Sequence, residues 1–166
     1  MPVSIRAIAA STFAASVCLF AAPSQAQLAT HKDLTYNIAR LIVEGAIADC
    51  AGRGYAASAV VVDRAGETIV AMRGDGAGPH TMENARRKAY TANSFKQLTT
   101  AYAKKYADGD KTVLQQVTLP NVIAIGGGVP IKVGNEVIGA AGLSGSPGID
   151  EECVNGGLAK VADQLK

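Results

Sequence analysis

Three side chains on one predicted helix could together bind a flat, acidic ligand. They are the ammonium group of Lys88, the hydroxyl group of Thr91 and the ring of Phe95. At 3.6 residues per turn they fall within a sector of about 60°, beside a stripe of mostly alanine residues that suits close packing on a sheet. A pocket could therefore form along this margin. The same residues also fit an ordinary helix edge whose lysine extends into solvent, and the sequence leaves both interpretations open.

Glycines surround this helix in the sequence. Three of them lie between Arg73 and Pro79, where the backbone must bend sharply before the helix begins, with Thr81 as its expected N-cap. Gly127 belongs to a triple-glycine kink, and Gly142 lies in a predicted strand, where it leaves space for a helix or a ligand. The candidate ligand-binding residues are Arg73, Lys88, Thr91, Phe95, Gly127 and Gly142.

Metal-binding and catalytic motifs are sparse. His31 and His80 are the only imidazoles, and neither stands at metal-ligand spacing from another histidine or a cysteine. The sequence contains no phosphate-binding loop, dinucleotide fingerprint or nucleophile elbow. A Ser–His–Asp triad assembles from distant residues, so sequence alone does not exclude one. We therefore assign no catalytic residue and leave enzymatic activity open.

The first 26 residues are typical of a secretory signal peptide. Arg6 is their only charge, an apolar run extends from Ala7 to Ala22, and small residues precede a cleavage site expected after Ala26. The run is short for a membrane span and no stop-transfer pattern follows it, although an uncleaved anchor is the alternative. We predict a periplasmic or secreted protein in which residues 27–166 form a single domain.

Charge and cysteine content narrow the partners further. Lysine and arginine total 16 against 14 acidic residues, and without Arg6 the balance is 15 − 14 = +1, which argues against nucleic-acid binding. Cys50 and Cys153 remain after signal cleavage. In an oxidising compartment they could form a disulfide if the first and last helices are neighbours. Two separate buried thiols are the alternative.

Hydrophobic periodicity predicts the order helix, two strands, two helices, three strands, helix. The two-residue turn Gly134–Asn135 and the tight turn that begins at Asp63 indicate hairpins, so the strands pair in antiparallel fashion. We expect an α+β domain with a five-stranded antiparallel sheet flanked by helices. The predicted helices are 28–53, 81–99, 102–109 and 149–165, the segment 111–119 is a loop or a short helix, and the predicted strands are 58–63, 68–72, 121–125, 129–133 and 136–143.

Five segments of the sequence together form a recognisable series: Val62–Gly66, Arg73–Ala77, Ala85–Ala92, Gly127–Ile131 and Gly139–Gly145. In this order they resemble the GlcG/HbpS family of haem-binding or haem-degradation-related proteins, which is similar to the C-terminal domain of PduO-type adenosyltransferases. The resemblance extends from about Leu28 to the C-terminus. It implies profilin-like α/β/α layers, a tendency to form homo-oligomers and, in some members, haem bound non-covalently near the central helix.

The resemblance makes haem the leading candidate ligand. In that case Thr91 and Phe95 would border a flat slot, and Lys88 or Arg73 would meet a propionate. His31 and His80 are candidate iron ligands, and the sequence does not choose between them. The leading hypothesis is a periplasmic or secreted protein that sequesters or senses haem. The alternatives are an enzyme or binding protein for a small organic acid, anchored by Arg73 and Lys88, and a purely structural oligomer.

Overall fold

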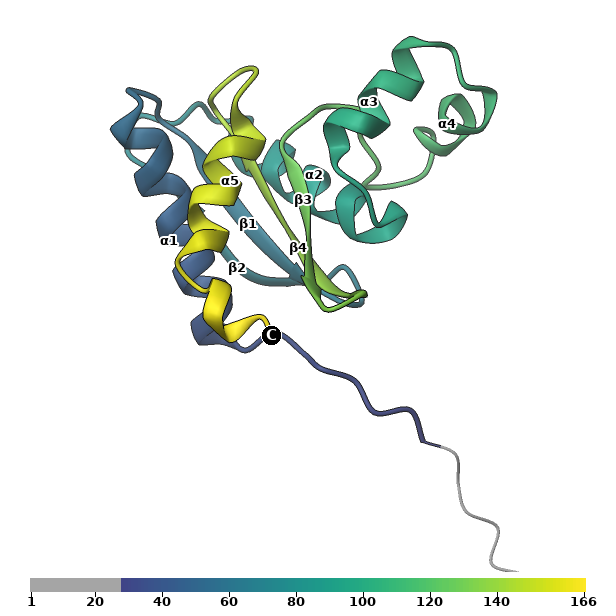
Figure 1. Cartoon of the computed structure of the whole chain (residues 1–166). Coiled ribbons are helices and arrows are strands. Elements are labelled where there is room, and N and C mark those ends of the chain that lie inside the picture. The colour runs from purple at the N-terminus through teal and green to yellow at the C-terminus, as the bar shows by residue number, and fades with distance from the viewer. Residues whose placement is uncertain (1–27) are drawn as a thin grey trace, which may run out of the picture. The chain divides into compact units, whose positions relative to one another are not determined.

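The computed structural model describes residues 28–166, of which residues 31–166 form one compact unit (Figure 1). The predicted signal peptide and its cleavage site lie outside the described residues. Among residues 28–166, no helix is long and apolar enough to cross a membrane. The elements are α1 (Tyr36–Gly52), β1 (Ser58–Asp63), β2 (Thr68–Arg73), α2 (Thr81–Phe95), α3 (Thr99–Ala107), α4 (Lys111–Gln116), β3 (Gly128–Val133), β4 (Glu136–Ser144), α5 (Asp150–Ala159) and a 3-10 turn, η1 (Ala162–Gln164).

Four antiparallel strands form the sheet, in the order β2-β1-β4-β3. Two hairpins, β1–β2 and β3–β4, lie side by side because the whole of β1 pairs with residues 139–144 of β4. The predicted turns are confirmed: Gly134–Asn135 separates β3 from β4, and the Asp63 carboxylate accepts hydrogen bonds from the backbone N–H groups of Ala65 and Glu67. The α+β class is therefore confirmed, with one strand fewer than expected.

The missing strand is the predicted segment 121–125, which forms no ladder with another strand. Its backbone groups bind side chains of α2 instead: the guanidinium of Arg87 donates to the carbonyl oxygen of Val122 (2.7 Å), and the N–H of Ile123 donates to Thr91 Oγ1 (2.9 Å). Asn121 adopts a left-handed conformation, with φ 68°, which is incompatible with an extended strand. The apolar run was wrongly assigned as a strand; within it Val122 is buried and Ile125 is exposed.

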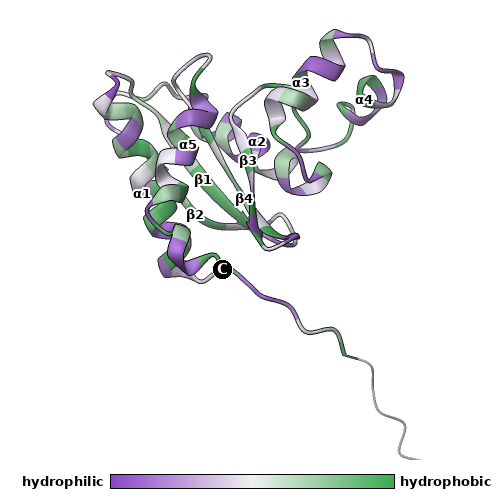
Figure 2. Ribbon diagram, viewed as in Figure 1, coloured by the Kyte–Doolittle hydropathy of each residue, from purple (hydrophilic) through white to green (hydrophobic). Residues whose placement is uncertain are grey.

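The sheet separates two apolar layers, as strand alternation requires. Ala59 and Val61 of β1 face the cluster formed with α1 and α5, whereas Val60 and Val62 face the cluster formed with α2. Figure 1 shows α1 and α5 side by side on one face of the sheet and α2 on the other, and β1 is hydrophobic along most of its length in Figure 2. The result is the α/β/α layering implied by the family resemblance.

Helix α2 lies unusually close to the sheet, as its alanine stripe predicted. Ala85 and Ala89 are fully buried, and a Cβ atom added at Gly142 or Gly128 would collide with the backbone carbonyl of α2 at Ala85 or Lys88. Only glycine allows a helix backbone to approach strands this closely. This close approach decides which residues of α2 can reach a pocket.

The first and last helices are neighbours on the opposite face. Gly157 of α5 lies against the backbone of α1 at Ile42, and Cys50 and Cys153 form a disulfide between the two helices, with their Cα atoms 5.3 Å apart. The two cysteines are thus bonded to each other in the structure. This bond fixes the start of α5, which carries part of the site described below.

Some predicted helix boundaries shift. Helix α1 begins at Tyr36 because Thr35 provides the N-cap, and α5 ends at Ala159, before η1. The N-cap of α2 is His80 rather than Thr81, whose hydroxyl instead donates to the carbonyl of Gly78 (2.6 Å) and contacts Ser58 Oγ (2.7 Å). Residues 111–116 do form a short helix, capped by the side chain of Asp110.

Candidate functional site

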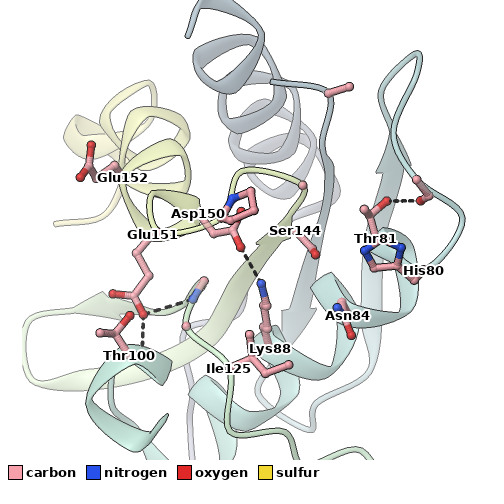
Figure 3. Close-up of a pocket in the computed structure, with 17 residues that line it drawn as sticks. His80, Thr81, Asn84, Lys88, Thr100, Ile125, Ser144, Asp150, Glu151 and Glu152 are labelled. Carbon is pink, nitrogen blue, oxygen red and sulfur yellow. Dashed lines mark hydrogen bonds and ion pairs between the residues drawn. The ribbon is translucent and has the colours of Figure 1, made fainter. Parts of the chain in front are cut away.

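A cavity of about 780 Å³ opens where the start of α2 meets the end of β4, the first turn of α5 and the glycine-rich loop before β3 (Figure 3). Ala56 and Thr100 also line it, so segments far apart in the sequence build its wall. The side chains used below are those of His80, Asn84, Lys88, Ser144, Asp150 and Glu151, and all six line the cavity.

A buried ion pair lies in the wall of this cavity. Lys88 Nζ is 2.6 Å from Asp150 Oδ2, and the side chains are only 2% and 9% exposed. Nζ also donates to the carbonyl oxygen of Leu143 (3.1 Å), while Asp150 Oδ1 accepts from the backbone N–H (2.9 Å) and the hydroxyl (2.7 Å) of Ser146. Both charges are thus compensated inside the protein, as burial requires. Figure 3 shows Lys88 extending from α2 toward Asp150 at the start of α5.

Gly127 covers this ion pair. A Cβ atom at this position would lie 2.9 Å from Lys88 Nζ and 2.7 Å from Asp150 Cβ, and the residue has φ 124°, in the region that favours glycine. The triple-glycine kink therefore exists in part so that the loop can pass directly over the charged pair. Gly127 was a predicted ligand-binding residue, and it does line the cavity.

The acidic residues at the start of α5 are also compensated. Glu151 Oε1 accepts hydrogen bonds from the backbone N–H groups of Thr100 (2.8 Å) and Gly127 (3.3 Å), which attaches the start of α3 and the glycine-rich loop to α5. Glu152 pairs with Arg53 (3.0 Å) at the surface. The pKa of Arg53 is raised, chiefly by its hydrogen bond to Asp49 and to a smaller extent by Glu152.

Four polar side chains of the cavity make no hydrogen bond to any residue in the described part of the chain: His80, Asn84, Thr100 and Ser144. His80 is exposed, and the apolar side chain of Ile125, which is 45% exposed, lines the same cavity. Ser144, by contrast, is only 4% exposed. These groups are available to a ligand, because the protein itself does not use them.

The predicted margin of α2 is only partly at the cavity. Lys88 reaches it, but the hydroxyl of Thr91 is buried and accepts the hydrogen bond from Ile123, and Phe95 stacks on Tyr102 with ring centroids 4.8 Å apart. The expectation that these three side chains share one slot is wrong. Because α2 is pressed onto the sheet, residues 121–124 and α3 cover the part of the margin beyond Lys88.

Three other predicted site residues, Arg73, Gly142 and His31, do not line the cavity. Arg73 is exposed at the end of β2, and the space at Gly142 is filled by the backbone of α2, so neither lines the cavity. His31 lies beside Glu136 at the start of β4, with 3.6 Å between Nδ1 and Oε1. Of the two imidazoles, His80 alone lines the cavity.

Sequence reasoning missed Asp150, Ser144, Asn84 and Glu151 as site residues. The acidic run at the start of α5 was interpreted only as helix-terminus stabilisation, and no local pattern marks Ser144 or Asn84. Within residues 28–166, no group of three or more histidine, cysteine, aspartate or glutamate side chains could hold a metal ion.

The chain thus forms a small α+β domain whose four-stranded sheet lies between helices. A cavity of the size typical of ligand sites lies at the start of α2. The chain belongs to the family described as "Haem degrading protein HbpS-like", whose model matches residues 34–159.

Two curated relatives support this assignment. An uncharacterised 15.0 kDa protein of Citrobacter freundii is 34% identical over 86 residues, which span 51% of this chain and 61% of that protein. Protein GlcG of Escherichia coli strain K12 is 28% identical over 111 residues, 67% of this chain and 81% of that protein.

Solved structures show the same fold. A double mutant of HbpS from Streptomyces reticuli has a TM-score of 0.74 and 33% identity, covering 84% of this chain and 96% of that one. Protein ORFY of Klebsiella pneumoniae has a TM-score of 0.76 at 26% identity, covering 82% and 96%. A complex described as PduOC with heme has a TM-score of 0.71 at 23% identity, covering 78% and 95%, and shows a shared fold.

Proposed function

We propose that this protein binds haem in the cavity at the start of α2, with His80 as a ligand to the iron. The family to which the chain belongs and the HbpS structures it resembles support haem as the ligand. The observation that carries the proposal is the imidazole of His80, which lines a cavity of about 780 Å³ and has no hydrogen-bond partner among the described residues. Such an imidazole is a common axial ligand of haem iron.

The residues of the cavity are compatible with haem. Its volume lies within the range of roughly 300–1,000 Å³ typical of ligand sites, and Ile125 offers apolar surface at the rim, near the glycine-rich loop. Asp150 and Glu151 make the inner wall unfavourable for propionates, so we expect the propionates to face solvent. Haem would supply the iron chemistry, while the chain supplies the imidazole, the enclosing loop and a wall without an unpaired lysine or arginine.

The small-acid alternative loses its structural support. It relied on Arg73 and Lys88 as two carboxylate anchors, but Arg73 does not line the cavity and the charge of Lys88 is compensated by Asp150. A carboxylate entering the site would meet the oxygens of Asp150 and Glu151 as well. No observation favours this function over haem binding.

We further propose that the protein is exported, with cleavage after Ala26, and that it forms a homo-oligomer that sequesters or senses haem. The disulfide between Cys50 and Cys153 supports an oxidising compartment. Mass spectrometry of the protein recovered from the periplasm or medium tests the cleavage site, and light scattering of the purified protein tests the oligomer. A full-length cytoplasmic product would refute the export proposal, and a monomer would refute the oligomer.

The test of haem binding is a titration of hemin into purified mature protein, followed by the Soret absorption band. We expect a saturable shift for the wild type, and at least a tenfold weaker affinity for His80→Ala, equivalent to about 1.4 kcal/mol. His31→Ala is the matched control, because it removes the other imidazole, which does not line the cavity, and it should bind hemin like the wild type.

Each other outcome is informative. A wild type without a saturable Soret change would refute haem binding itself. Equal weakening by His80→Ala and His31→Ala, or by neither, would refute His80 as the ligand.

A further inference from the structure

Ser144, the last residue of β4, lines the cavity and is 4% exposed. Its hydroxyl makes no hydrogen bond to another described residue. Among the described side chains, Arg64 Nε alone is fully enclosed without a partner, so the hydroxyl of Ser144 keeps some contact with the cavity. Water or a ligand inside the cavity can therefore be its hydrogen-bond partner.

Lys88 contributes a second donor to the same cavity. Its ammonium group has three N–H bonds, and the structure shows two acceptors for them, the carbonyl of Leu143 and the carboxylate of Asp150. The carbonyl acceptor belongs to the residue directly before Ser144 in the chain. Lys88 Nζ therefore lies close to the backbone that leads into Ser144, and both side chains line the same cavity.

The charges around these donors favour an uncharged ligand group. Asp150 compensates Lys88, backbone N–H groups hold Glu151, and Arg53 pairs with Glu152. Because the opposite charges of Lys88 and Asp150 are only 2.6 Å apart and offset each other, neither an anionic nor a cationic group gains net attraction from the pair. An uncharged carbonyl oxygen can accept two hydrogen bonds and needs no such attraction.

We propose that the cavity contains a subsite for the carbonyl oxygen of a small uncharged carbonyl compound, such as an amide or a ketone, held by Ser144 Oγ and Lys88 Nζ. This subsite needs neither haem nor His80, so it goes beyond the haem-binding proposal and stands or falls separately from it. The two ligands share one cavity, and haem bound there would compete with the carbonyl compound.

The test is an NMR titration of haem-free, isotope-labelled protein with acetamide, and separately with acetate, which has a similar shape but carries a negative charge. Acetamide should cause saturable shifts at the backbone amides of Ser144 and Gly145. Acetate should bind more weakly. Ser144→Ala should weaken the binding of acetamide about three- to tenfold, as expected for the loss of one hydrogen bond.

Ser94→Ala is the matched control, because Ser94 is an exposed serine of α2 that does not line the cavity, and it should bind acetamide like the wild type. Ser144→Ala should keep the melting temperature of the wild type, since its hydroxyl bonds to no other described residue. This separates a lost ligand contact from a damaged fold.

Three results would overturn the proposal: no saturable shift with acetamide, equal affinity of the wild type and Ser144→Ala, or equal or tighter binding of acetate. His80→Ala distinguishes the two proposals. It should lose hemin affinity while still binding acetamide, and loss of both ligands would refute a separate carbonyl subsite.

Discussion

Replacing Lys88 with methionine should lower the free energy of unfolding by about 3–5 kcal/mol, the range measured when one partner of a buried ion pair is removed. The substitution would leave the carboxylate of Asp150 without its cation at a position that is 9% exposed. Asp150 Oδ1 would keep its two hydrogen bonds from Ser146, so we expect a value near the lower end of the range. Methionine preserves the length of the side chain, which keeps the contribution of a new cavity small.

The surface pair of Lys104 and Asp108 provides a control with the same N–O distance of 2.6 Å, but its side chains are 73% and 58% exposed and it lies within one helix. Lys104→Met should therefore cost less than about 1 kcal/mol. The difference between the two variants measures what burial and the additional hydrogen bond to the carbonyl of Leu143 contribute at Lys88.

Urea unfolding followed by circular dichroism is the assay, and unchanged m-values would show that the unfolded states are comparable. A double-mutant cycle with Asp150→Asn isolates the pairwise interaction. Lys88→Met combined with Asp150→Asn should be more stable than the sum of the single effects predicts, by about 0.5–3 kcal/mol. If Lys88→Met and Lys104→Met cost the same, or if the cycle shows no coupling, the buried pair does not stabilise this site as we argue.

Three further measurements test the packing. Gly142→Ala should destabilise the protein by roughly 1–3 kcal/mol, because the new methyl group collides with α2. Gly52→Ala, at an open helical position, should stabilise it by about 0.5–1 kcal/mol. Equal melting temperatures of the two variants would contradict the packing described at Gly142. Reduction of the Cys50–Cys153 disulfide, which joins residues 103 apart, should lower the free energy of unfolding by about 2–5 kcal/mol in urea, and no change on adding dithiothreitol would contradict the bond. Burial raises the pKa of Tyr102, so the unfolded chain loses this proton at a lower pH than the folded protein does. The contribution of Tyr102 to stability should therefore be constant well below pH 10 and fall as the pH rises from there toward the folded-state pKa. Tyr102→Phe should remove this part of the slope between pH 9 and 11.

Local patterns were sufficient for most of the fold. The alanine stripe of α2 predicted a helix pressed onto glycine-bearing strands, and the structure shows this contact at Gly142 and Gly128. The turn residues Gly134 and Asp63 likewise marked the two hairpins. These features follow from side-chain size and turn chemistry over a few neighbouring residues, so one sequence is enough to recognise them.

The wrongly assigned strand at 121–125 shows a limit of prediction from local sequence patterns. An apolar run of this length fits a buried strand and a buried loop equally well. The outcome is decided by Arg87 and Thr91, more than thirty residues away in the chain, whose side chains bind the backbone groups that a strand would need for pairing. Hydrogen bonds of this kind depend on the tertiary structure, and the local periodicity of the sequence does not predict them.

The residues that line the cavity were mostly not predicted from the sequence, for a related reason. Helical spacing correctly grouped Lys88, Thr91 and Phe95 on one margin, but angle alone does not say how far a side chain extends. Because α2 lies so close to β4, the segment before β3 and helix α3 cover Thr91 and Phe95. Of the three residues, Lys88 alone lines the cavity, where it reaches Asp150. The close packing that identified the helix therefore also removed two of its three predicted ligand contacts. In the proposals above, ligands in this cavity are therefore bound by Lys88 together with His80, at the start of α2, and Ser144, at the end of β4.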